Sequence, residues 1–90
     1  MTVEDVFVIK NRGVVATGRV DSGVLRVGDT VHINGGVGLR VDAIEKFRKK
    51  LDEAAAGENI GVLFKDIEKT EIDRGAVITG SGSDAAPFIV

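Results

Sequence analysis

Short runs of β-branched and aliphatic residues, each ended by a glycine or a glycine-containing turn, recur along the chain. Strands are predicted at residues 5–10, 14–20, 24–27, 30–34, 59–65 and 76–79. In the fourth of these runs apolar and polar positions alternate, which places Val31 and Ile33 on one face. Valine and isoleucine pack well on pleated sheets, and glycine permits tight turns. The pattern therefore predicts an all-β sandwich or barrel.

One segment, residues 42–56, carries a different pattern. Its apolar residues recur at the spacing of one helix face, at Ile44, Phe47, Leu51 and Ala55. Lysine and glutamate fill the intervals, and Gly57 stands where a helix C-terminus favours glycine. Considered locally, the segment is predicted to be an amphipathic helix.

The length and composition predict one globular domain. The chain has 90 residues, of which 43% are hydrophobic and 29% charged, and this is typical of a soluble globule. We expect a β-domain at residues 1–80 and a flexible tail at residues 81–90. A net charge of −2 argues against coating nucleic acid by bulk electrostatics, although a local basic patch stays compatible with it.

Several classes of protein are disfavoured by what the sequence lacks. There is no cysteine, so disulfides and cysteine metal sites are absent. No apolar run approaches the roughly 20 residues of a membrane span. The acidic N-terminus does not have the layout of a signal peptide. We therefore expect a cytoplasmic protein that does not contact a membrane.

No catalytic motif is recognisable. Residues 13–20 approach a phosphate-binding loop, but Arg19 replaces its lysine and Val20 replaces the hydroxyl residue that would hold magnesium. A strand is the better interpretation of this segment. His32 is the only histidine and has no nucleophile pattern beside it. We expect no enzyme activity, no cofactor and no metal site.

One local basic run stands out, formed by Lys46, Arg48, Lys49 and Lys50. It is either a solvated loop or a patch that contacts phosphates, and the sequence leaves both interpretations open.

An ordered set of motifs closely resembles the second domain of bacterial elongation factor Tu. The motifs are VEDVF at 3–7, RGVVATGRV at 12–20, GVLRVGD at 23–29, FRKKLDE at 47–53, AGENIG at 56–61 and IDRG at 72–75. The resemblance spans nearly the whole of residues 3–80. It implies a closed antiparallel β-barrel of the kind found in translational GTPases. It also implies a strand at residues 39–47 and a loop with one helical turn at residues 48–57, in place of the local helix.

The resemblance further implies a site for the 3′ end of aminoacyl-tRNA. Ile9, Val15 and Leu63 match the apolar walls around the terminal adenine, and Glu45 matches the carboxylate near the ribose. Such a carboxylate can accept a hydrogen bond from a 2′-hydroxyl, which distinguishes RNA from DNA. Arg48 matches a residue near the ester. The residues that match positions around the aminoacyl group are Glu4, Asp5, Phe7, Thr17, Phe47 and Asn59. For the apolar positions, packing within the barrel is the alternative interpretation.

Two departures from the family affect what the resemblance implies. Asn11 stands where the family usually has glycine, so its side chain would narrow the adenosine pocket. The GTPase motifs are absent, so we expect no GTP binding by this chain.

Three interpretations of function remain open. The first is a non-catalytic module that contacts the 3′ end of aminoacyl-tRNA or ribosomal RNA, with Lys46, Lys49 and Lys50 at phosphates. The second is a protein-interaction module that docks on a GTPase domain. The third is a domain without an independent role.

Overall fold

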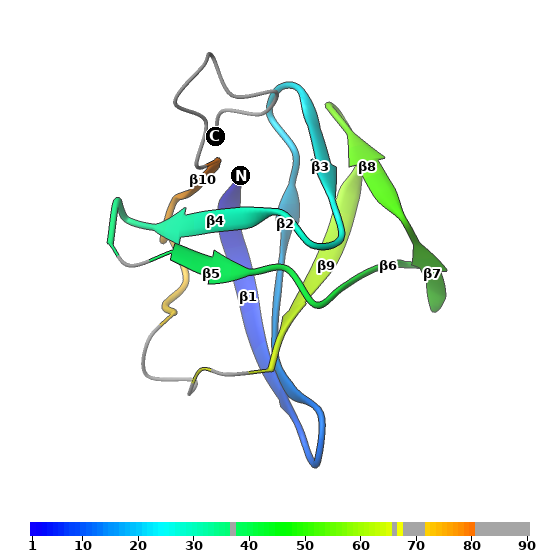
Figure 1. Ribbon diagram of the computed structural model, residues 1–90, viewed down its shortest axis with the longest axis vertical. Helices are drawn as coiled ribbons and strands as arrows, with labels where there is room; N and C mark the ends of the chain where they lie inside the picture. The colour runs from blue at the N-terminus through cyan, green and yellow to red at the C-terminus, as the bar shows by residue number, and fades with distance from the viewer. Residues whose placement is uncertain (37, 66, 68–71, 81–90) are drawn as a thin grey trace.

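The computed structural model describes residues 1–36, 38–65, 67 and 72–80, and within these ranges the chain is entirely β-structure and turns (Figure 1). No helix that could span a membrane occurs in this part of the chain. The predicted tail at residues 81–90 lies outside the described residues. The strands are β1 (Thr2–Ile9), β2 (Gly13–Arg19), β3 (Val24–Arg26), β4 (Thr30–Ile33), β5 (Gly38–Arg40), β6 (Ala43–Lys46), β7 (Lys49–Leu51), β8 (Glu53–Ala55), β9 (Asn59–Phe64) and β10 (Ile78–Gly80).

The largest sheet contains five antiparallel strands in the order β1-β2-β9-β6-β7. Side chains alternate between its two faces, because successive residues of a strand point in opposite directions. In β2, Val14 and Ala16 are buried, and their partners in β9, Phe64 and Val62, are buried too. These residues line the inner face. The residues between them in sequence form the outer face of the sheet.

Backbone hydrogen bonds and one chain connection link this sheet to β4, β5 and β10. β10 pairs with β4, and β4 pairs with β5. The chain then runs directly from β5 through Val41 into β6 of the large sheet. On the other side, Val3 N–H donates to Ala76 O at 2.8 Å and Ile78 N–H to Met1 O at 2.8 Å, which joins β1 to the segment leading into β10. These links arrange the strands around one core, as in a small β-barrel.

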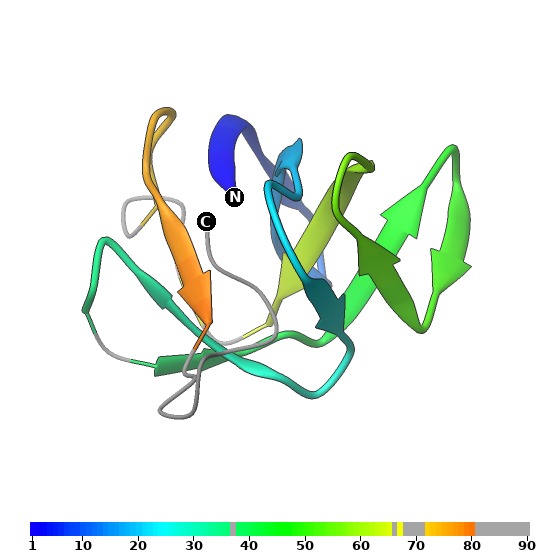
Figure 2. The ribbon, with the colours of Figure 1, turned by 90° about the horizontal axis from the view of Figure 1, so that it is seen from above.

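The remaining two strands, β3 and β8, pair with each other beside the large sheet. The hairpins β1–β2 and β6–β7 project from the body of the molecule (Figures 1 and 2). Both projecting hairpins belong to the five-stranded sheet, so they extend its outer face.

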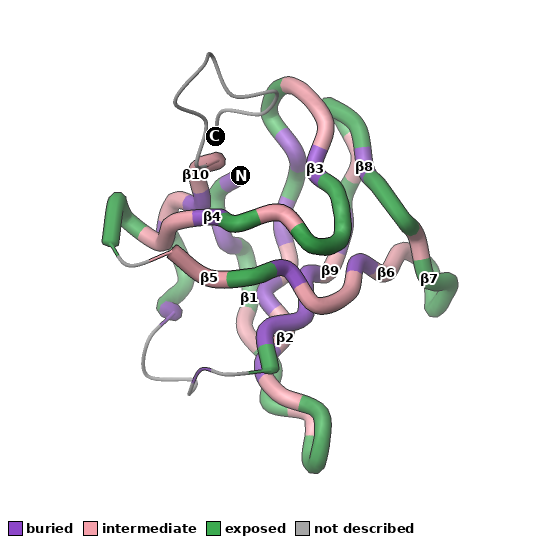
Figure 3. The backbone as a smooth tube through the Cα atoms, viewed as in Figure 1, coloured by how far each residue is buried: buried purple, intermediate pink, exposed green. Residues whose placement is uncertain are grey.

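The barrel interior is filled mainly by valine and isoleucine. Figure 3 shows where the buried residues lie along the backbone. The fully buried residues include Val31, Val41, Ile44 and Val62. The largest fully buried side chain in the described part of the chain is that of Phe64. No polar or charged side chain is buried among the described residues. Burial of such aliphatic side chains contributes roughly 1.5–3 kcal/mol each, so the β-branched pattern of the sequence is also the pattern of the core.

The structure corrects both sequence-based predictions for residues 48–57. The local helix is wrong, and the loop implied by the resemblance is also wrong, because β7 and β8 occupy this segment. The cause is a two-residue turn at Phe47 and Arg48, whose φ angles are 51° and 65°. Two consecutive positive φ angles are typical of a type I′ turn, which matches the twist of a hairpin. Lys46 and Lys49 form the pair that closes the hairpin.

The other strand predictions are confirmed with small shifts. The first strand begins earlier than predicted, at Thr2, and contains a bulge between Val3 and Asp5. The bulge interrupts the alternation of side chains between the two faces at the start of this strand. Residues 13–19 form a strand, as expected from their departures from a phosphate-binding loop. The expected strand at 39–47 appears as β5 and β6, with a bend between them.

Candidate nucleic-acid interface

The outer face of the five-stranded sheet brings most of the predicted site residues together. The register of the strands places them in two neighbouring rows across the sheet. The apolar row contains Phe7, Val15, Leu63 and Ala43. The polar row contains Asp5, Thr17, Gly61, Glu45 and Lys50. Ile9 and Asn59 lie on the same face, beyond the apolar and the polar row respectively.

The apolar row forms a partly exposed hydrophobic strip. Phe7 is 52% exposed, whereas Ile9 and Val15 are half-buried. Leu63 is only 3% exposed, and it lies at the floor of a cavity on this face. Leu63 is buried although it does not belong to the cluster of core residues inside the barrel. Packing within the barrel does not explain Phe7 either, because an aromatic side chain that is half exposed leaves a large apolar area in water.

A hollow of about 220 Å³ lies at the polar row. The predicted site residues Glu4, Thr17, Glu45, Phe47 and Asn59 line it, together with Gly61. Side chains in the hollow offer hydrogen-bond acceptors, one hydroxyl and one amide, which suit a polar ligand. Lys46, a predicted phosphate contact, also lines the hollow, so six of the predicted positions, drawn from four separate strands and one turn, meet at one place.

Gly61 keeps this hollow open, and the sequence analysis did not identify it. A Cβ at Gly61 would lie 3.0 Å from Val15 Cγ1 and 3.9 Å from Glu45 O. Any side chain at this position would therefore occupy the space between β2 and β6. Glycine inside a strand often marks a close approach of a ligand, and this was the signal available in the sequence.

An ion pair crosses the outer face between the turn after β1 and β6. Arg12 Nη2 donates to Glu45 Oε2 at 3.4 Å, with 42% and 30% of the two side chains exposed. The pair fixes the Glu45 carboxylate beside the apolar row. Arg12 was not among the predicted site residues, because the link between its turn and β6 depends on the tertiary fold.

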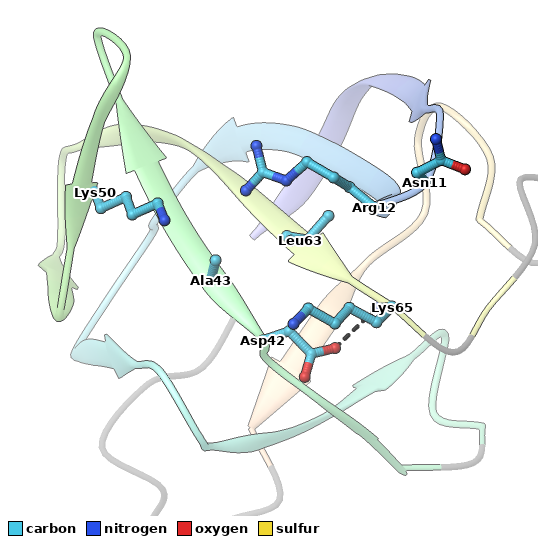
Figure 4. A pocket seen from close by; sticks show the side chains of 7 residues that line it. All are labelled: Asn11, Arg12, Asp42, Ala43, Lys50, Leu63 and Lys65. Carbon is cyan, nitrogen blue, oxygen red and sulfur yellow. Dashed lines mark hydrogen bonds between the residues drawn. The ribbon is translucent and has the colours of Figure 1, made fainter.

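A second cavity, of about 410 Å³, lies on the Arg12 side of the outer face (Figure 4). Its floor includes Leu63 and Ala43, and its rim is polar. The rim residues are Asn11, Arg12, Asp42, Lys50 and Lys65. Asn11 is thus one of the residues at the rim of the cavity, and its narrowing of an adenosine pocket stays a prediction.

The tip of the β6–β7 hairpin presents Phe47 and Arg48 to solvent. The Phe47 side chain is 87% exposed, and Lys46 Nζ lies 5.6 Å from the centre of its ring. This distance is within the range of a cation–π contact. Lys46 also pairs with Glu58 at 3.3 Å. The pKa of Glu58 is lowered, first by the hydrogen bond from Ala55 N–H and then by Lys46.

The predicted phosphate patch is divided by the strand geometry. Glu45 pairs with Lys50, and Lys46 pairs with Lys49. Because side chains alternate along a strand, Lys50 shares the outer face with Glu45, whereas the side chain of Lys49 points to the other side of the hairpin. Lys46 lines the hollow at the polar row, and Lys50 lines the cavity whose floor includes Leu63 and Ala43.

Glu4 and Asp5 lie at the bulge in β1. Arg74 Nε donates to Glu4 O at 3.1 Å and lies 3.6 Å from Asp5 Oδ1. The bulge places both acidic residues at the edge of the polar row, and Arg74 ties them to the segment before β10. Both side chains remain exposed.

The fold and this face define a small antiparallel β-barrel with one polarised surface, apolar in one row and polar in the next. A family model, Elongation factor Tu domain 2, matches residues 13–79. The match covers well over half of the chain, so the chain belongs to this family and is a translation-factor domain. Strand β1, which contributes Glu4, Asp5, Phe7 and Ile9, precedes the matched region.

Proposed function

We propose that the chain is a non-catalytic RNA-binding module that contacts the aminoacylated 3′ end of tRNA. The terminal base would stack on the apolar row, the ribose would lie at Glu45, and the aminoacyl group would enter the hollow of about 220 Å³. Membership in a translation-factor family supports this reading. The same family context makes ribosomal RNA the other candidate RNA.

The observation that carries the proposal is the adjacency of the two rows. An apolar row next to a polar row suits a terminal nucleotide, whose base is flat and apolar and whose ribose offers hydroxyl groups. Glu45 stands in the polar row, and its register partner toward the sheet centre is Gly61, which leaves room for a ligand.

An NMR titration of the ¹⁵N-labelled chain with a short aminoacylated acceptor-stem RNA tests this proposal. We expect shifts confined to the outer face, at Phe7, Glu45, Asn59 and Leu63. The deacylated RNA should still shift Glu45 and the residues of the apolar row, and it should leave Asn59 of the hollow unshifted. Shifts that appear only with a ribosomal RNA fragment would redirect the proposal to that RNA. No shift at millimolar RNA would refute RNA binding by this face.

A protein-interaction role is the second candidate, and the exposed aromatic residues favour it. Phe7 and Phe47 are 52% and 87% exposed, and Val8 is 60% exposed on the other face of β1. An apolar surface of this kind also fits a protein partner such as a GTPase domain. Binding to such a partner would depend weakly on salt, whereas binding to RNA would weaken steeply as salt rises.

A further inference from the structure

Three cationic side chains from separate segments line the cavity of about 410 Å³. Arg12 comes from the turn between β1 and β2, Lys50 from β7, and Lys65 from the residue after β9. Figure 4 shows Arg12 and Lys50 on either side of the apolar floor, and Lys65 beside Asp42. The chain has a net charge of −2, so this local excess of positive charge is not a property of the whole surface.

The acidic groups at the cavity already have partners. Asp42 Oδ2 accepts the backbone N–H of Lys65 at 2.8 Å, and Glu45 is paired with Arg12. In the described part of the chain, neither the Lys50 ammonium nor the Lys65 ammonium lies within ion-pair distance of a carboxylate. Asp42 keeps its negative charge, but the two lysines outnumber it, so the cavity has an excess of positive charge that a bound anion would offset.

The shape of the cavity indicates what kind of anion it would take. A bare phosphate would leave the floor of Leu63 and Ala43 in contact with water, whereas a nucleotide covers it with an apolar base or sugar edge. Phosphate oxygens accept several charge-assisted hydrogen bonds at once, and lysine is a common donor to them. An apolar floor with a cationic rim therefore matches one nucleotide with its 5′-phosphate.

We infer that Lys50 and Lys65 form a subsite for the 5′-phosphate of the nucleotide whose base lies over the apolar row. This inference rests on the proposed function and adds the orientation of the bound RNA strand to it. The phosphate lies between Lys50 on β7 and Lys65 after β9, and the ribose hydroxyls lie toward Glu45 and the hollow at Gly61. The bound strand then arrives over Lys65 and ends at the hollow.

The test compares the binding of adenosine, of AMP and of inorganic phosphate to the full chain by ¹H–¹⁵N NMR titration. In low salt, AMP should bind about three- to ten-fold more tightly than adenosine, a range expected for a few solvent-exposed charge pairs. Lys50→Gln and Lys65→Gln should each reduce this ratio and leave the affinity for adenosine unchanged. The ratio should also fall at about 0.15 M salt, where exposed charges are screened.

Lys49→Gln is the matched control, since it removes the same charge from the adjacent residue on the other side of β7. If Lys49→Gln lowers the ratio as much as Lys50→Gln, the effect is one of net charge and the subsite is refuted. Equal affinities for adenosine and AMP would also refute the subsite. In that case the binding of adenosine itself would still support the proposed function. If adenosine, AMP and acceptor-stem RNA all fail to bind, both the proposed function and the subsite are refuted.

Discussion

Arg12 in the turn after β1 and Glu45 in β6 are linked across the outer face of the sheet by a 3.4 Å ion pair. Strands β2 and β9 lie between the two elements, so the pair passes over the middle of the face. Because both side chains are partly exposed, the pair contributes at most about 1 kcal/mol to stability. Its larger effect is to hold the Glu45 carboxylate in place within the polar row, where the proposed ribose lies.

Glu45→Ala is expected to remove discrimination between ribose and deoxyribose at the 3′ end. A hydrogen bond to a carboxylate is worth roughly 1.5–3 kcal/mol, so the native chain should prefer a 3′-terminal ribonucleotide by about ten-fold. The affinities for acceptor-stem RNAs with a 2′-hydroxyl and with a 2′-deoxy terminal adenosine measure this. Glu53→Ala, which removes an exposed acid on β8, is the control. A variant lacking Glu45 that keeps the ten-fold preference would show that Glu45 does not contact the ribose.

Gly18 on β2 and Gly61 on β9 occupy diagonal positions in two paired strands. We expect their replacement by alanine to have different effects. A Cβ at Gly18 would lie 2.4 Å from the backbone oxygen of Thr2, which cannot move without disturbing β1. Gly18→Ala should therefore destabilise the fold by about 2 kcal/mol or more. At Gly61 the nearest atom is a side-chain methyl of Val15 at 3.0 Å.

Gly61→Ala should change the free energy of unfolding by less than about 1 kcal/mol, because the tight contact is offset by the lower entropy of the unfolded chain. It should weaken binding of the aminoacylated acceptor stem several-fold, since the methyl group fills the hollow. Urea unfolding and the NMR titration measure the two effects. Unchanged affinity in Gly61→Ala would mean that the ligand does not enter this hollow.

The periodicity of the sequence predicted the strands but not the segment after β6. Aliphatic runs ended by a glycine-containing turn predicted β1, β2 and β4, because each run combines strand propensity with a local turn, and the run of Ile60, Val62 and Leu63 after Gly57 predicted β9. The helical spacing of Ile44, Phe47 and Leu51 arises instead from a hairpin. Ile44 and Leu51 are cross-strand partners, so both face the core although seven residues separate them.

The candidate site was predicted in part, and what was missed depends on tertiary contacts. Residues on the strands followed from the resemblance, and the register then placed them on one face. Arg12 and Lys65 could not be identified from the sequence, because their positions beside Glu45 and Lys50 depend on how β6 and β9 pair. The division of the lysine run between two faces likewise required the register of β7.

The carboxylate of Glu58 should make stability depend on pH in the acidic range. Its pKa is lowered below the ordinary value of 4.5, first by the hydrogen bond from Ala55 N–H at 2.8 Å and then by Lys46 at 3.3 Å. A group whose pKa is lowered by folding stabilises the fold above the unfolded-state pKa, and this contribution is lost as pH falls through the folded-state pKa. Urea unfolding at a series of pH values from neutral to below 4.5 should therefore show stability falling, and Glu58→Gln should flatten part of that fall. An identical pH profile in the variant would contradict this role.

We expect the residues of the turn at Phe47 and Arg48 to lower the stability of the fold and to strengthen the binding of RNA. Phe47 at φ 51° and Arg48 at φ 65° adopt a left-handed conformation that costs side-chain-bearing residues about 1–2 kcal/mol each. Asparagine and glycine adopt a type I′ turn readily. The double variant Phe47→Asn/Arg48→Gly should therefore raise the free energy of unfolding by about 1–2 kcal/mol, less than the full sum because Phe47 loses its contact with Lys46. Urea unfolding measures this change.

The same double variant should bind aminoacylated acceptor-stem RNA more weakly, because it removes the exposed ring of Phe47 from the lining of the hollow and the exposed cation of Arg48 from the adjacent hairpin tip. A matched control is available at the turn between β4 and β5, where Asn34 and Gly35 also have positive φ angles, of 53° and 74°. Asn34→Ala should lower stability, since Asn34 Oδ1 accepts Val77 N–H at 2.9 Å, and should leave RNA affinity unchanged. A more stable hairpin variant with full RNA affinity would show that the strained turn serves no binding role. A less stable one would show that the contacts of Phe47 and Arg48 outweigh their backbone strain.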